Sequence, residues 1–193
     1  MMNNANQCII AFAGRRTDEV TAEQTRFPFE RVPAVQRALS DLFVRESAVG
    51  LVASAACGSD LTALAAAQAI GIRSRIVLPF IRGHFRQTSV VDRPHAEYWG
   101  KLFDHLTEDA KSRDDLVELG LNESAPSTYS RVNRAILSEA HRLATRPIQR
   151  LLAVIAWDGV PRGEEDFTKE FAVLAVAEGF DLREVSTSGS SRA

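Results

Sequence analysis

The sequence predicts an α/β fold of the Rossmann-like kind, in which helices cover both faces of a mainly parallel sheet and form three layers. Continuous apolar runs, CIIAFA at residues 8–13 and RLLAVIA at residues 150–156, are typical of strands buried on both faces. Between these runs, apolar residues recur at helical spacing. Residues 49–80 join two further apolar runs through one helix, and a length of about 30 residues suits a βαβ crossover.

The length of 193 residues allows one well-buried domain. We expect this domain over residues 1–185 and a disordered tail over residues 186–193, because STSGSSRA is of low complexity. The formal net charge is −2 without a long basic run, so a nucleic-acid partner is not expected. The first residues lack a signal-peptide pattern and no span is apolar enough for a membrane. We therefore expect a cytoplasmic protein without a membrane partner, and leave a homodimer open.

Cysteine and histidine residues show no spacing typical of a metal site. Cys8 begins the first predicted strand and Cys57 lies in the central turn, without a CxxC pattern. The four histidines contain no pair spaced four residues apart on one helix, and no Ser-His-Asp arrangement follows from the sequence. No metal and no cofactor are expected, and reduced thiols fit a cytoplasmic compartment.

The first half of the chain alternates between strands and helices. Residues 17–29 have no apolar period and are expected to form a loop. Pro33 suits the first turn of a helix that runs to Glu46. A strand begins at Val49, and an alanine-rich helix follows the turn at residues 55–60 and reaches Ile70. Gly71 ends this helix, and a strand is expected at residues 75–80.

The second half is expected to contain a long loop, three further helices, one peripheral helix and two strands. Its elements are predicted as a loop at 81–95, a helix from Trp99 through Leu106, a peripheral helix at 107–121, a helix from Tyr129 to Leu143, a strand at 150–156, a helix capped by Asp166 and ended by Gly179, and a strand at 182–185. Trp99 and the apolar residues after it are interpreted as core rather than as a stacking surface.

The central turn at residues 55–60, AACGSD, is the first candidate for a binding site. Small residues there allow a ligand to approach the backbone, Ser59 or Asp60 can cap the helix, and the free N–H groups of its first turn suit a phosphate. The turn matches neither a GxGxxG nor a Walker sequence. The alternative is a turn whose small residues only allow close packing.

Polar groups also follow the first strand and the strand at residues 150–156. Gly14, Arg15 and Arg16 place cations where open α/β sheets bind ligands, although a solvated turn with surface arginines is the alternative. Replacing both arginines by alanine is expected to weaken an anionic ligand with little loss of fold stability. Loops as long as residues 81–95 are often binding loops or lids.

Parallel strands would bring these ends to one edge of the sheet, where a nucleotide would bind. Two roles are open for Trp157 and Tyr129: either side chain could cover a base or ribose of the ligand, and the alternative is that it belongs to the core. Asp158 accepts from ribose hydroxyls, or caps its own backbone. The candidate ligand-binding residues are Gly14, Arg15, Arg16, Ser54, Gly58, Ser59, Asp60, Arg82, Ser89, Tyr129, Asn133, Trp157, Asp158, Gly159 and Thr168.

Glu170 is the candidate catalytic residue. A carboxylate one turn into a helix that begins at the ligand edge can act as nucleophile or acid/base at a ribose anomeric carbon. A surface glutamate that interacts favourably with the helix dipole is the alternative. A non-catalytic binding or sensor module and an enzyme that cleaves or transfers an N-glycosidic bond are therefore both kept, beside a scaffold with a vestigial pocket.

Taken together, these segments resemble the SLOG superfamily, a Rossmann-like group that includes the DNA-processing protein, the "lonely guy" phosphoribohydrolases and nucleotide-sensing relatives. The chain is similar in particular to bacterial SLOG modules, and the similar pieces follow in order over nearly its whole length. They are residues 13–16 (AGRR), 26–28 (RFP), 55–60 (AACGSD), 78–80 (LPF), Phe85 with 89–90 (SV), 129–133 (YSRVN) and 157–159 (WDG).

The resemblance implies a nucleotide or a nucleotide-derived, ADP-ribose-like ligand at the sheet edge, sensed or cleaved at an N-glycosidic bond. Arg15 stands where the family often has histidine, which keeps a cation. Residues 163–168, GEEDFT, replace a Gly-Gly-Thr phosphate cradle, and their acids would repel a phosphate there. The enzymatic members of the family use a Gly-Thr-x-x-Glu-like helix start in this region. Thr168 and Glu170 match this motif only in part.

Overall fold

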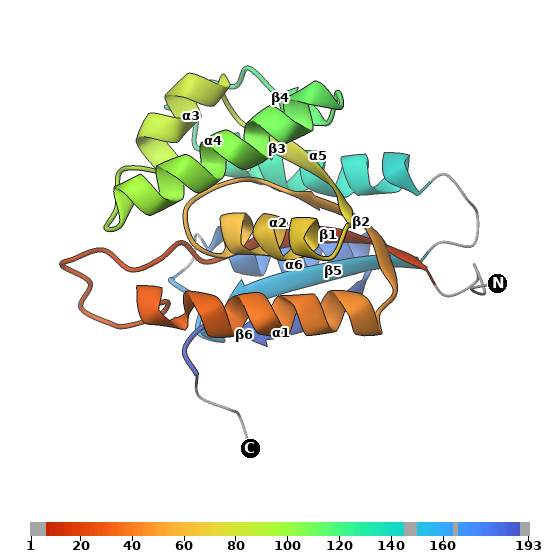
Figure 1. Cartoon of the computed structure of the whole chain (residues 1–193), viewed down its shortest axis with the longest axis horizontal. Coiled ribbons are helices and arrows are strands. Elements are labelled where there is room, and N and C mark those ends of the chain that lie inside the picture. Colours follow the sequence, from red (N-terminus) through yellow and green to blue (C-terminus); the bar gives the residue numbers. More distant parts are fainter. Residues whose placement is uncertain (1–6, 145–149, 164–165, 190–193) are drawn as a thin grey trace.

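The middle layer of the molecule is a six-stranded sheet in which every neighbouring pair of strands is parallel. The computed structural model describes residues 7–144, 150–163 and 166–189. The sheet order is β4-β3-β2-β1-β5-β6 (Figure 1). The strands are β1 (Cys8–Gly14), β2 (Ala48–Ala53), β3 (Arg73–Leu78), β4 (Leu116–Glu118), β5 (Arg150–Trp157) and β6 (Asp181–Ser186). The α/β fold class and the parallel sheet expected from the sequence are confirmed.

Helices cover both faces of this sheet and complete the three layers (Figure 1). The helices α1, α2, α3 and α4 contribute to the apolar core on one face, and α5 and α6 to the core on the other. Their bounds are η2 (Phe29–Arg31), α1 (Val32–Arg45), α2 (Ser59–Ala69), α3 (Arg82–Ser89), α4 (Ala96–Ser112), α5 (Thr128–Leu143) and α6 (Phe167–Ala177).

The strand β1 shows how one apolar run serves both cores. Ile10 and Phe12 belong to the core beneath α1 and α2, whereas Ile9 and Ala11 belong to the core beneath α5 and α6. Successive side chains of a strand point to opposite faces, so a strand covered on both sides is apolar at every position. The continuous run at residues 8–13 therefore predicts this central position correctly.

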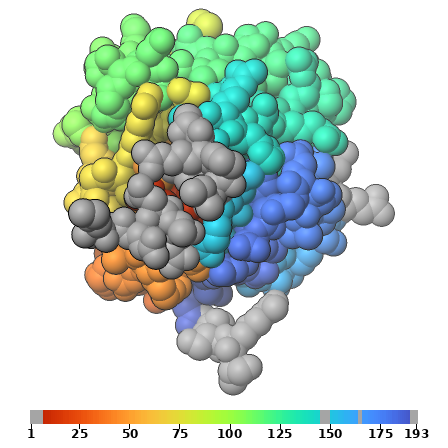
Figure 2. Space-filling model, turned by 90° about the vertical axis from the view of Figure 1, so that its right-hand side faces the viewer, coloured from red at the N-terminus to blue at the C-terminus, as the bar shows by residue number. Residues whose placement is uncertain are grey.

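The direction of the strand order changes at β1, which pairs with β2 on one side and with β5 on the other. Phe12 is in register with Ala53, and Gly14 is in register with Ala156, so the three strands end close together. Open α/β sheets bind ligands at the carboxyl edge beside such a change of direction. Figure 2 views the molecule from the opposite edge, at the amino ends of the strands, where the cyan segment of α5 adjoins the blue segment of α6.

The expectation of a loop over residues 81–95 is wrong for its first part, which forms α3. Phe85 is buried and packs near Phe103 of α4, with 6.1 Å between ring centroids. Arg86 reaches the same helix and donates two hydrogen bonds of 2.9 Å to Asp104. Tertiary contacts hold this short helix, and a polar segment with one large apolar side chain shows little helical period.

The expectation of a separate peripheral helix over residues 107–121 is also wrong, because residues 107–112 continue α4 and residues 116–118 form a strand. The helix α4 ends at Ser112, and the edge strand β4 pairs in parallel with β3. Between them, Asp115 has no exposed surface and accepts hydrogen bonds from both Arg73 and Arg75 on β3. A strand of three residues is too short for its alternation to be recognised in the sequence.

The sequence placed the start of the tail too early. Ser186 is the last residue of β6, and Thr187 is fully buried. The backbone N–H of Thr187 donates to the carbonyl of Trp157 over 3.0 Å, and its hydroxyl donates to the carbonyl of Arg26 over 2.7 Å. Residues 190–193 of the expected tail lie outside the described residues.

Candidate functional site

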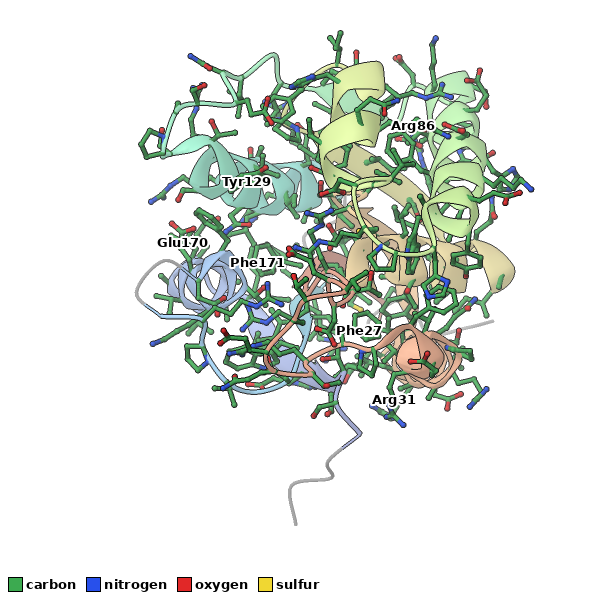
Figure 3. All side chains as sticks on the ribbon, turned by 90° about the vertical axis from the view of Figure 1, so that its left-hand side faces the viewer. Phe27, Arg31, Arg86, Tyr129, Glu170 and Phe171 are labelled. Carbon is green, nitrogen blue, oxygen red and sulfur yellow. The ribbon has the colours of Figure 1, made fainter. Side chains whose placement is uncertain are left out.

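A cavity of about 350 Å³ lies at the carboxyl edge of the sheet, between the ends of β1, β2 and β3 and the first turns of α5 and α6. Figure 3 looks onto this edge and shows Tyr129 on α5 above Glu170 on α6. The cavity is lined by Phe12, Ala13, Gly14, Arg15, Arg16, Ser54, Ala56, Asp60, Pro79, Phe85, Ser89, Tyr129, Val132, Asn133, Ile136, Arg162, Asp166, Phe167 and Thr168. The ends of three parallel strands and the starts of two helices from the second half of the chain thus line one cavity at the carboxyl edge of the sheet.

Arg15 lines this cavity, but its guanidinium is committed to the protein. Nη1 and Nη2 donate to the two carboxylate oxygens of Asp166 over 2.9 and 2.7 Å. Nε donates to Asp158 over 3.3 Å, and Nη2 also donates to the carbonyl of Val160 over 2.8 Å. Only 4% of Arg15 is exposed. Arg15 therefore joins the end of β1 to the loop after β5, instead of offering the free cation that the sequence predicted.

Asp166 is the N-cap of α6, as the sequence predicted. Its side chain accepts from the backbone N–H groups of Thr168 and Lys169. Burial alone would raise its pKa, but hydrogen bonds from Arg15 and from the backbone N–H groups of Arg162 and Lys169 lower the pKa of Asp166 to about 2. A carboxylate already occupies this helix end, where a phosphate would otherwise find N–H groups. The expectation for Glu164 and Glu165 lies outside the described residues.

The central turn is tightly packed against the loop after β1. A side chain at Gly58, whose φ is +104°, would meet the backbone nitrogen of Thr17 at 2.5 Å and the carbonyl of Arg15 at 2.7 Å. The backbone N–H of Ser59 donates to that same carbonyl over 2.9 Å. The expectation that a ligand approaches the backbone at Gly58 is therefore wrong, because the loop after β1 occupies that space.

Neither Ser59 nor Asp60 caps α2 in the way the sequence indicated, because the N-cap is Gly58, which makes no side-chain cap hydrogen bond. Ser59 instead donates to the carbonyl of Ala156 over 3.4 Å, beneath Gly14. Asp60 turns back and accepts from the N–H of Ala56 over 3.3 Å. The first turn of α2 is thus directed at the protein.

Asp60 is a buried carboxyl group in the lining of the cavity, with 8% of its surface exposed. Burial raises the pKa of Asp60 to about 7, although the N–H groups of Ala56 and Gly14 and the charge of Arg16 lower it. Asp166 is held ionised by its hydrogen bonds, so Asp60 is the one carboxyl of this lining that changes its charge near neutral pH. A carboxyl group with such a pKa can both give and accept a proton.

Arg16 also reaches the cavity. Its Nη2 contacts the carboxylate of Asp92 and donates to Sγ of Cys57 over 3.3 Å. The Nε of Arg16 is buried and has no hydrogen-bond partner in the described part of the chain. Cys57 and Cys8 are buried free thiols, and burial raises the pKa of Cys57.

Arg162 is a cation that the sequence reasoning missed. It lines the cavity and also a second one of about 450 Å³, whose other charged residues are Asp18, Glu19, Glu23, Arg26 and Arg93. Its guanidinium forms no ion pair with any residue in the described ranges 7–144, 150–163 and 166–189. Burial lowers the pKa of Arg162, and the nearby charges of Arg15 and Arg26 lower it further. Its place five residues after Trp157, in the loop beyond β5, is the signal that could have identified it.

Asn133 and its neighbours form the side of the cavity made by α5 and α6. The amide nitrogen of Asn133 donates to the carbonyl of Phe167 over 2.9 Å and to Oε2 of Glu170 over 3.1 Å. Tyr129 packs near Phe167, with 5.3 Å between ring centroids. Glu170 itself does not line the cavity, so its carboxylate lies behind Asn133 and not among the lining residues.

The structure brings many of the sequence-predicted residues to the cavity and leaves others away from it. The predicted residues in the lining are Gly14, Arg15, Arg16, Ser54, Asp60, Ser89, Tyr129, Asn133 and Thr168. Those outside it are Gly58, Ser59, Arg82, Trp157, Asp158, Gly159 and Glu170.

Arg82, Trp157 and Asp158 have other partners in the structure. Arg82 pairs with Glu108 on α4. The Cζ atom of Arg15 lies over the ring of Trp157, 5.7 Å from the ring centroid. The Nε1 of Trp157 donates to Glu184 over 2.8 Å. Asp158 accepts from Arg15 and Arg26, which is neither the ribose contact nor the backbone cap that the sequence allowed.

Two further features are absent from the part of the chain that the structure describes. No group of three or more His, Cys, Asp or Glu side chains there is arranged to hold a metal ion. None of the described helices has the length and apolar character needed to span a bilayer.

The comparisons with known proteins concern the fold. No protein-family model and no curated protein matches the sequence. Among solved structures, the chain is similar to the X-ray structure of DNA processing protein A (DprA) from Streptococcus pneumoniae, at 14% identity and a TM-score of 0.40. This match covers 95% of the present chain and 60% of that chain. The fold is Rossmann-like. The sheet order and the two helix layers establish this, and they agree with the fold that the SLOG resemblance implies.

Proposed function

We propose that the cavity at the carboxyl edge of the sheet binds or senses a nucleotide-derived, ADP-ribose-like ligand. The observation that carries this proposal is the joining, in one cavity, of aromatic and aliphatic side chains with two guanidinium groups: that of Arg162, and that of Arg16, which pairs with Asp92 through Nη2 but has a buried Nε without a partner among the described residues. Apolar walls with a few convergent polar groups are typical of small-molecule sites, and about 300 Å³ is the lower end of their usual volume.

The charge distribution favours an anionic part of the ligand beside Arg162. Its pKa is lowered by burial and by other arginines, and the charge of Asp158 offsets this only in part and without an ion pair, so an incoming anion would relieve the remaining repulsion. Guanidinium groups bind phosphate through several N–H groups at once. Arg15 has no such role, because Asp158 and Asp166 already neutralise it.

The second cavity favours a ligand longer than a mononucleotide. It shares Arg162 with the first cavity. Arg93 beside it pairs with Glu19 through Nη2 over 2.9 Å, while its buried Nε has no partner among the described residues. A ligand with two sugar phosphates can place its pyrophosphate near Arg162 and extend into both spaces. This arrangement supports the ADP-ribose-like class that the sequence resemblance implies.

Isothermal titration calorimetry and thermal-shift measurements with AMP, ADP-ribose, cyclic ADP-ribose and NAD test this proposal. Ligand binding should raise the midpoint of unfolding. Arg162→Ala should weaken binding by roughly 10- to 150-fold, since a charged hydrogen bond contributes about 1.5–3 kcal/mol. Arg37→Ala, an exposed arginine on α1, is the matched control and should leave affinity unchanged. If none of these ligands stabilises the protein at millimolar concentration, the proposal is wrong.

Cleavage of an N-glycosidic bond is the second candidate, and Asp60 is the observation that favours it. The sequence indicated Glu170 for this role, but Asp60 is the carboxyl in the cavity lining with a pKa near 7. In its protonated form Asp60 would give its proton to the leaving base as the C–N bond breaks. Water would then add to the anomeric carbon and return a proton to the Asp60 carboxylate.

Release of free base from AMP, followed by chromatography, distinguishes these carboxyl groups. Asp60→Asn should abolish release while still binding AMP, whereas Glu170→Gln should retain release if Asp60 transfers the proton. Loss of activity in Glu170→Gln alone would return the catalytic role to Glu170. If the parent protein binds AMP but releases no free base, binding or sensing remains as the function.

A further inference from the structure

We propose that Asn133 selects a ligand whose base carries an exocyclic amino group, as adenine does, and that Glu170 is a positioning residue for this contact. The inference rests on the proposed function, because it concerns the base of the nucleotide bound in the same cavity. It assigns a specificity to α5 that neither the sequence reasoning nor the fold provides.

The orientation of the Asn133 amide is determined by the two groups behind it. Both the carbonyl of Phe167 and the carboxylate of Glu170 are acceptors, and they lie 2.9 and 3.1 Å from Nδ2. An amide nitrogen has two N–H donors, and each finds one of these acceptors. Turning the amide over would place Oδ1 against two oxygen atoms, which is repulsive, so the nitrogen stays on this side.

The carbonyl oxygen of Asn133 is consequently left for the cavity. Oδ1 accepts no hydrogen bond from a residue in the described ranges, and it is not one of the buried atoms without a partner. The residue as a whole is only 6% exposed and lines the cavity. An accessible acceptor on an otherwise buried side chain is suited to read a donor on a ligand.

The surroundings of Asn133 indicate that the ligand group beside it is a base. Val132 and Ile136 on the same helix, with Tyr129 and Phe167, line the cavity around it. Flat rings are accommodated by aliphatic and aromatic surfaces of this kind. Adenine carries an amino group at the position where hypoxanthine carries an oxo group. The amino group of adenine would donate to Oδ1, whereas the oxo group of hypoxanthine would place another acceptor against Oδ1.

Glu170 acts through Asn133 and not on the ligand. Its carboxylate offers acceptor oxygens only, so it accepts from the nitrogen side of the amide. A glutamine at this position has an amide of its own, which can turn and donate to Oδ1 of Asn133. Glu170→Gln therefore loosens the orientation while preserving the size of the side chain, and the Phe167 carbonyl remains as the second acceptor.

Calorimetric titration of the full chain with AMP and with IMP tests the inference. The parent protein should bind AMP about tenfold more tightly than IMP, as expected for one hydrogen bond gained and one repulsion avoided. Asn133→Ala should bring the ratio of the two dissociation constants close to one by weakening AMP. Glu170→Gln should lower the ratio by a smaller factor, and Ser138→Ala, an exposed position on the same helix, should leave it unchanged.

The ratio separates selection from structural damage, because a loss of folding weakens both nucleotides together. If Asn133→Ala does not fold, Glu170→Gln carries the test. Equal affinity of the parent for AMP and IMP, or an unchanged ratio in both variants, overturns the inference and leaves the proposed function standing. Absence of binding by either nucleotide, and by ADP-ribose and NAD, overturns both.

Discussion

Arg15 and Asp166 form a doubly hydrogen-bonded ion pair although 151 residues separate them in the chain. The side chains are 4% and 1% exposed. The pair holds the end of β1 against the start of α6, and both residues line the candidate site. The shape of the cavity therefore depends on a contact whose two partners lie on different segments.

Removing one partner of this pair should destabilise the fold. We expect Arg15→Ala to lower the free energy of unfolding by about 3–5 kcal/mol, because it leaves the Asp166 carboxylate buried without its cation. Urea unfolding followed by circular dichroism measures this change. In the double variant Arg15→Ala/Asp166→Ala, the loss should be smaller than the sum of the single losses. A loss below 0.5 kcal/mol, roughly that of an ordinary surface change, would contradict the structural role of Arg15.

Asp166 should stabilise the protein above pH 4 and lose this effect in acid. Its folded pKa of about 2 is below its ordinary value of 3.8, so the native state binds the proton less readily than the unfolded chain. The contribution, about 2 kcal/mol, is present above pH 4 and disappears as the pH falls towards 2. The difference in unfolding free energy between the parent and Asp166→Asn, measured at several pH values, should shrink over this interval. A difference that stays constant would show that Asp166 is not responsible.

Asp60 should have the opposite pH dependence. Its folded pKa of about 7 is above its ordinary value of 3.8, so the stabilising contribution is present below pH 4 and is lost as the pH rises through 7. Asp60→Asn cannot ionise and should therefore become more stable relative to the parent across this range, by about 4 kcal/mol. Unfolding curves at pH 4 and pH 8 provide the measurement. A relative stability that does not rise with pH would mean that Asp60 is ionised as usual.

A methyl group at Gly58 should damage the packing of the central turn. Gly58→Ala adds a Cβ within 2.5 Å of the Thr17 backbone at a φ of +104°, and we expect a loss of about 2–4 kcal/mol of unfolding free energy. Gly71→Ala is the matched control, because its φ of +75° is also positive but no atom lies within 4 Å of the added Cβ. The control should cost only about 1 kcal/mol. Equal losses in urea unfolding would show that backbone strain, and not packing, makes Gly58 necessary.

Local patterns in the sequence were sufficient for the central strands and the longer helices. The apolar run of β1 and the amphipathic spacing of α1 and α5 are properties of neighbouring residues, and so is the capping of α6 by Asp166. The same patterns failed for α3 and β4, which are short and depend on contacts such as that of Asp115 with Arg73.

The sequence by itself determined that polar residues follow several parallel strands, and therefore that they meet at one edge of a sheet. Only the tertiary structure decided what each of these residues does there. Arg15 is neutralised by Asp166, and the loop after β1 fills the space beside Gly58. Arg162 lines the cavity without an ion pair to any of the described residues. The physical reason is that a charge or a small side chain acquires its role from its neighbours in space. For this site those neighbours come from segments far apart in the chain.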